Sequence, residues 1–120
     1  MHLALPCLLA VLSSACVKAP PITGVRVLDE RFRIVKVLDA SEIADFERMW
    51  DGKKQTDAAL QDSGGRHFKI DIERGRASSN RWLYQSTGLA RVLTVKAGRP
   101  VYRLQDPEAF NALIGAAAGG

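Results

Sequence analysis

A chain of 120 residues, of which 47% are hydrophobic and 25% charged, has the composition of an ordinary globular protein and is not disordered throughout. Its length suits one domain, and a chain of this size can bury about 60 to 70% of its unfolded surface without disulfides or metal ions. The formal net charge of +4 is uneven, because residues 64–104 carry nine Lys or Arg against two Asp or Glu.

The chain begins with an apolar run. Leu3 to Val17 contains no charged side chain, but its 15 residues fall short of the about 20 that a membrane-spanning helix needs. The small residues Ser13-Ser14-Ala15 are typical of a signal-peptide cleavage site. We therefore interpret residues 1–15 as a signal peptide, with a buried N-terminal helix as the alternative.

The stretch Ser13-Ser14-Ala15-Cys16 resembles the lipobox of bacterial lipoproteins, with serine where the family usually has leucine three positions before the cysteine. The resemblance covers residues 1–16 and implies cleavage before Cys16 and a diacylglyceryl group on its thiol. Acyl chains in pairs or threes hold a protein durably to a membrane. Val17 resembles the outer-membrane sorting class, so the resemblance implies a lipid anchor that faces the periplasm. Cleavage to a soluble periplasmic protein is the other outcome.

Cysteine usage agrees with export. Cys7 and Cys16 are the only cysteines, so the mature domain would hold neither a free thiol nor a disulfide in an oxidising compartment. A disulfide between the two in an unprocessed chain is the alternative. After Cys16, a linker to residue 23 contains Pro20-Pro21, which favours an extended polyproline II conformation about 20 Å long.

Strands are predicted near 24–28 and 32–38 from partly alternating, β-branched residues. A helix follows, because Asp39 and Glu42 have the spacing of a capping box and Gly52 marks an end. Its apolar stripe is predicted to face the core and consists of Ile43, Phe46, Met49 and Trp50.

Residues 55–65 are predicted to form a loop, and a short helical turn at 58–61 is the alternative for that part. Strands at 68–73 and 81–86 are predicted to form an antiparallel hairpin with a loop of about seven residues. Residues 89–95 fit a strand or a helix, and β-branching favours the strand. A last strand at 101–104 precedes a helix that begins at Asp106 and Pro107 and ends at Gly115.

The whole pattern predicts an α+β fold, an antiparallel β-sheet with two short helices packed on one face. Residues 24–115 would form the single domain, and residues 116–120 a flexible tail.

A candidate binding surface lies in the basic hairpin and combines cations with aromatic rings: Arg74, Arg76, Arg81, Trp82 and Tyr84. Its expected partners are an envelope protein or anionic headgroups, which attract cations near a membrane surface. An exported protein rarely meets nucleic acid, so none is expected. The alternative is that the arginines only solvate the sheet while the two rings fill the core.

Catalytic residues are not apparent in the sequence. His67 is the only histidine after residue 15, and no cluster has the spacing of a zinc or calcium site, so neither a metal nor a cofactor is expected. We expect a small lipid-anchored envelope protein with a non-catalytic binding or assembly role. The alternative is a periplasmic inhibitor or immunity-type protein that blocks an enzyme.

Overall fold

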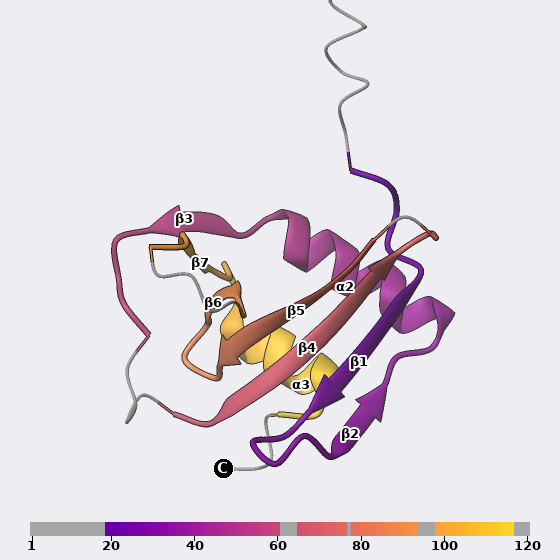
Figure 1. Cartoon of the computed structure of the whole chain (residues 1–120), viewed down its shortest axis with the longest axis horizontal. Helices are drawn as coiled ribbons and strands as arrows, with labels where there is room; N and C mark the ends of the chain where they lie inside the picture. The colour runs from indigo at the N-terminus through magenta and orange to yellow at the C-terminus, as the bar shows by residue number, and fades with distance from the viewer. Residues whose placement is uncertain (1–18, 61–64, 77, 94–97, 117–120) are drawn as a thin grey trace, which may run out of the picture.

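The computed structural model describes residues 19–60, 65–76, 78–93 and 98–116, and it confirms the α+β fold. An antiparallel sheet carries two helices on one of its faces (Figure 1). The proposed signal peptide and Cys16 lie outside the described residues.

Within the described residues the sheet has seven strands in the order β2-β1-β4-β5-β6-β7-β3, and all neighbouring strands are antiparallel. In chain order the elements are β1 (Gly24–Leu28), β2 (Ile34–Val37), α2 (Ala40–Asp51), β3 (Lys54–Thr56), β4 (His67–Arg74), β5 (Ser78–Gln85), β6 (Leu89–Val92), β7 (Val101–Arg103) and α3 (Pro107–Ile114). The two sheet edges are therefore β2 and β3.

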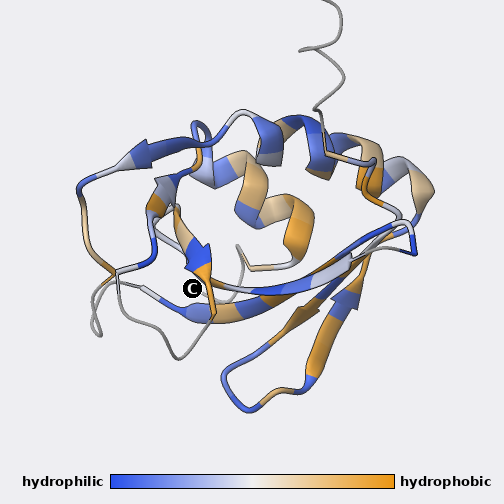
Figure 2. Cartoon of the chain, turned by 45° about the horizontal axis from the view of Figure 1, so that its top comes forward, coloured by the Kyte–Doolittle hydropathy of each residue, from blue (hydrophilic) through white to orange (hydrophobic). Residues whose placement is uncertain are grey.

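The core lies between one face of the sheet and the two helices. Alternate residues of β1 and β4 point into it, and Val27 pairs with Ile70, both fully buried. Phe46 of α2 and Phe110 of α3 meet in a tilted arrangement with ring centroids 5.3 Å apart, and Tyr84 of β5 meets Phe110 edge-on at 5.0 Å. Figure 2 shows the hydrophobic sides of the helices turned toward the sheet. The burial of these apolar surfaces stabilises the fold by about 25 cal/mol for each Å² removed from water.

Both predicted helices and their caps are confirmed. Asp39 accepts a hydrogen bond from the Glu42 backbone N–H at 2.9 Å, and the Glu42 side chain accepts one from the Asp39 N–H at 3.0 Å. Asp106 caps α3, and Gly115 ends it with φ of 81°, a left-handed conformation that glycine adopts without steric cost.

The structure corrects several boundaries. The loop expected over 55–65 begins with part of β3, whose polar residues form a strand because β7 offers backbone partners. Residues 58–60 have no regular structure, and residue 61 lies outside the described residues. The hairpin loop is shorter than predicted, since Arg74 already pairs with Ser78. Residues 89–92 form a strand, and Ala116, assigned to the tail, is buried.

Candidate binding surface

The five residues of the predicted surface do not lie together. Tyr84 is fully buried, its hydroxyl donates to Asn111 Oδ1, and burial raises the pKa of its phenol well above the ordinary value. Trp82 is half-buried and meets the Trp50 ring edge-on at 4.9 Å. Both aromatic residues therefore belong to the core side of the sheet, as the alternative interpretation expected.

Arg74 fastens the N-terminal segment to the domain. Its Nη1 donates to the Pro20 carbonyl at 2.7 Å, and its Nη2 lies 3.7 Å from Asp51 Oδ1. Only 17% of the Arg74 side chain is exposed, so it offers little charge to a partner. Arg76 is exposed in the β4–β5 turn, at the same end of the molecule.

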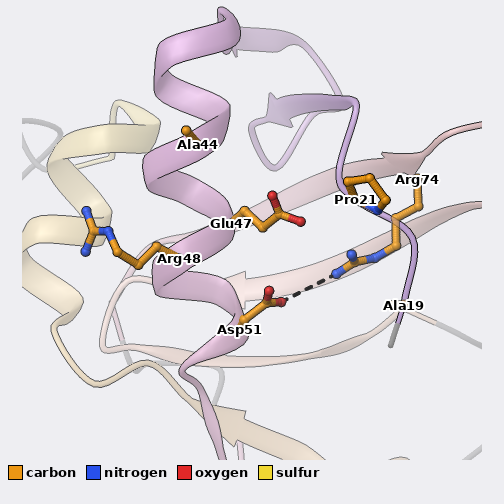
Figure 3. A pocket seen from close by; sticks show the side chains of 7 residues that line it. All are labelled: Ala19, Pro21, Ala44, Glu47, Arg48, Asp51 and Arg74. Carbon is orange, nitrogen blue, oxygen red and sulfur yellow. Dashed lines mark ion pairs between the residues drawn. The ribbon is translucent and has the colours of Figure 1, made fainter. Parts of the chain in front are cut away.

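A hollow of about 770 Å³ lies where this segment crosses α2 (Figure 3). Glu47 on its wall accepts a hydrogen bond from the Ile22 backbone N–H at 3.1 Å, and Ile22 itself is buried in the core. Its lining consists of Ala19, Pro21, Ala44, Glu47, Arg48, Asp51 and Arg74. Two of its four charged side chains, Glu47 and Arg74, bind the backbone of the N-terminal segment. We therefore assign the hollow to the attachment of this segment and not to ligand binding.

Arg81 lies on the face of the sheet opposite the helices, which we call the outer face. Its Nε and Nη2 donate to the two carboxylate oxygens of Asp71 at 2.6 and 2.8 Å, and Arg26 Nη2 donates to Asp71 Oδ2 at 3.1 Å. Hydrogen bonds from Arg81, joined by those from Arg26, hold the pKa of Asp71 below its ordinary value, although partial burial opposes them. We call these three residues the outer-face cluster.

Phe32 adds an aromatic ring beside this cluster. Lys69 Nζ lies 4.3 Å from the ring centroid, and the Arg81 guanidinium carbon lies 5.5 Å from it. Phe32 has φ of 65°, a conformation that costs a residue with a bulky side chain about 1 to 2 kcal/mol. Asp29 supports the turn, since its Oδ1 accepts from the Arg31 and Arg33 backbone N–H groups at 2.8 and 3.0 Å.

The exposed large apolar residues concentrate on the β1–β2 hairpin. Among the described residues five are exposed, and four of them are Phe32, Ile34, Val35 and Val37, with exposed fractions of 53, 56, 45 and 63%. We call these four the β2 patch. Figure 2 shows hydrophobic residues along this hairpin. Val37 borders a hollow of about 230 Å³ that it shares with Arg26 and Asp71, so the patch and the outer-face cluster are adjacent.

Sequence reasoning missed the β2 patch because β-branched runs usually mark buried strands. The residues were recognised as strand formers, but only the strand order shows that β2 lies at an edge of the sheet. The signal that could have indicated exposure was the polar run from Asp29 to Arg31, which separates β2 from the core-forming β1.

Lys53 was also not anticipated. Its Nζ lies 4.4 Å from the Trp50 ring centroid and 5.1 Å from those of Trp82 and Tyr102. Burial lowers the pKa of Lys53 to about 8, while the charge of Asp51 opposes this shift. The three rings favour the charged form of Lys53. Lys53 thus packs at the edge of the core through cation–π contacts.

His67 lines a hollow of about 440 Å³ at the hairpin end of the sheet, and its Nε2 lies 3.3 Å from Gln85 Nε2. Within the part of the chain that the structure describes, no group of three or more His, Cys, Asp or Glu side chains could hold a metal ion. Over the same ranges, no helix has the length and apolar character to cross a membrane. No protein family, curated protein or solved structure was found to match the chain.

Proposed function

We propose that the protein is a small, non-catalytic binding protein of the bacterial cell envelope. A lipid on Cys16 would hold it at the periplasmic face of a membrane, in the outer membrane by the sorting pattern. The β2 patch and its charged border would bind an envelope protein. The observation that carries the binding surface is the gathering of four exposed apolar side chains on the β1–β2 hairpin, three of them on the edge strand β2.

The border of the β2 patch is charged, with cations in excess. Five cationic side chains face four acidic ones over the β1–β2 hairpin and the adjoining outer face: Arg26, Arg31, Arg33, Lys69 and Arg81 against Asp29, Glu30, Asp71 and Glu73. Apolar residues bordered by charges are the usual arrangement of a protein-binding surface. Complementarity therefore favours a partner whose contact surface is apolar at the centre and acidic at the rim.

The place of the tether favours a protein over headgroups of the anchoring membrane. The N-terminal segment joins the domain beside the β4–β5 turn, and the tip of the β1–β2 hairpin lies at the other end of β1 (Figure 1). The five residues of β1 separate the two ends by about 17 Å.

The free tether would also be short. Pro20 and Ile22 are already bound to Arg74 and Glu47, so only the four residues from Cys16 to Ala19 could span the gap to the lipid, at most about 14 Å. A domain held this closely at one end would present the hairpin tip away from its own membrane.

The anchor is tested by mass spectrometry of the N-terminal peptide from native membranes. We expect a peptide that begins at Cys16 and carries a diacylglyceryl mass. A peptide that retains residues 1–15, or an unmodified Cys16 thiol, would contradict the anchor and leave the binding surface to be judged separately.

The surface is tested in cells by a photo-crosslinking amino acid, p-benzoylphenylalanine, in place of Val35 and, as the matched control, in place of Arg48 on α2. We expect an adduct with one envelope protein from position 35 and none from position 48. Arg31→Glu should weaken that adduct by about fivefold, as the reversal of an exposed charge would, whereas Arg48→Glu should not.

Three results would overturn the assignment of the surface. The first is an equal adduct from both positions, and the second is no adduct from position 35. The third is an adduct with lipid only, which would instead favour the headgroups as the ligand.

A further inference from the structure

We infer that β2 binds its partner by strand addition, in which an extended acidic and apolar segment of the partner becomes the next strand of the sheet. This inference rests on the proposed function and specifies how the β2 patch would be used. Added strands bind through main-chain hydrogen bonds, and the alternate side chains supply specificity.

The two edges of the sheet differ in how they are protected. β3 is three residues long and polar, Lys54-Gln55-Thr56, which are features that discourage a further strand. β2 contains three exposed β-branched residues and no proline. A short charged edge and an open apolar one in the same sheet indicate that the open edge is the one available for pairing.

The only charged residue of β2 does not guard this edge. Lys36 Nζ lies 2.8 Å from Glu42 Oε2 and donates to the Leu113 carbonyl at 3.0 Å, so its side chain is turned to the helices and already paired. Its charge is therefore compensated within the domain and opposes an incoming strand little.

The register shows which backbone groups point outward. The Leu38 N–H donates to the Val25 carbonyl at 3.1 Å, and Val37 is opposite Arg26 in the ladder between β1 and β2. Because residues of an antiparallel strand alternate between bonding one neighbour and the other, the N–H and C=O of Val37 point away from β1. Both groups could therefore form hydrogen bonds with the backbone of an added strand.

Charge complementarity selects the partner's chemistry. The excess of cations around the β2 patch would repel a second copy of this chain, which brings the same excess to the contact. The hollow beside Val37 contains Asp71 and Glu73 as well as Arg26, so the cation excess lies at the hairpin tip. There Arg31, Arg33 and Arg66 line one hollow with Asp29 and Glu30, and an acidic side chain of the added segment would be attracted to it. The segment we infer thus alternates apolar and acidic residues.

The test uses the purified full-length chain and three synthetic peptides. The first probe is a capped peptide of alternating valine and glutamate; the second has lysine for glutamate; the third is the acidic peptide N-methylated at alternate backbone nitrogens. Fluorescence anisotropy gives the affinities, and hydrogen exchange of the Val37 amide reports the backbone contact.

We expect the acidic peptide to bind, to slow exchange at Val37, and to bind about tenfold more tightly than the lysine peptide. N-methylation should weaken binding by about fivefold for each main-chain hydrogen bond that it removes. Val37→Glu, which places a like charge against the acidic peptide at the open edge, should abolish binding, whereas Gln55→Glu on the opposite edge should leave it unchanged. Both variants should unfold at the wild-type temperature.

The inference and the proposed function fail separately. If N-methylation has no effect, or if the acidic peptide does not bind, strand addition is wrong, and an adduct from position 35 in cells would still support the surface. If the chain is a dimer whose Val37 amide is protected without peptide, a second copy occupies the edge. If the Val37 amide of a monomer is protected without peptide and this protection disappears on removal of residues 1–15, a segment of the same chain occupies the edge. Each of these outcomes overturns the inference.

Discussion

Asp71→Asn tests whether the outer-face cluster stabilises the sheet. The carboxylate joins β4 to both neighbouring strands, since it accepts two hydrogen bonds from Arg81 on β5 and one from Arg26 on β1. Asparagine keeps the shape and removes the charge, which leaves two cations side by side without their counter-ion.

The size of the effect follows from exposure. The Asp71 side chain is 11% exposed, whereas those of Arg81 and Arg26 are 38 and 51% exposed. Loss of a buried pair costs about 3 to 5 kcal/mol and that of an exposed pair under about 1 kcal/mol. A cluster between these limits gives about 2 kcal/mol, or about thirtyfold in the unfolding equilibrium constant.

Urea unfolding followed by the fluorescence of Trp50 and Trp82 measures this loss at about pH 7. Asp45→Asn is the matched control, because Asp45 pairs with Arg48 at 3.3 Å with 58% of its own side chain exposed. We expect the control to lose less than about 0.5 kcal/mol. Equal losses for the two variants would refute the reasoning.

The pH dependence gives a second check. Because the pKa of Asp71 in the folded protein lies below its ordinary value of 3.8, its contribution is complete above that value and is lost as the pH falls through the folded-state pKa. The difference between wild type and Asp71→Asn should therefore shrink in acid and approach zero at low pH. A difference that persists there would show that ionisation of Asp71 is not its cause.

Two further predictions concern Lys53 and Phe32. The pKa of Lys53 is about 8 in the folded protein and 10.5 ordinarily, so the unfolded chain binds the proton more tightly between these two pH values. The free energy of unfolding should therefore rise from pH 8 to pH 10.5 in the wild type relative to Lys53→Met, as measured by urea unfolding. A difference between the two proteins that stays constant across this window would contradict the prediction. Phe32→Gly should leave stability unchanged or raise it by up to about 1 kcal/mol, because glycine accepts the positive φ, yet it should weaken the adduct from position 35; a loss above about 1 kcal/mol in urea would show that the exposed ring is needed for folding.

Local patterns predicted the elements whose causes are local. Both helices were predicted with their caps, because the residues that form a capping box or an N-terminal Asp-Pro lie within one turn of each other. β4 was recognised from its strict alternation, in which Phe68, Ile70 and Ile72 are buried. β3 was missed, because its three polar residues pair only where β7 reaches them.

The candidate surface depended on contacts that no local pattern contains. Arg74 and Arg81 lie seven positions apart on one hairpin, yet one is bound to Pro20 and the other to Asp71. Residues predicted to act together were separated because strand pairing and the path of the N-terminal segment gave each its own partner.

The sequence by itself determined the fold class, the helix ends and the apolar positions of the central strands, since these follow from periodicity and capping within a few residues. The tertiary structure decided which apolar residues stay in contact with water. That choice depends on strand order: β2 became an edge of the sheet with a neighbouring strand on one side only, so Ile34 and Val37 are exposed although their residue types favour burial.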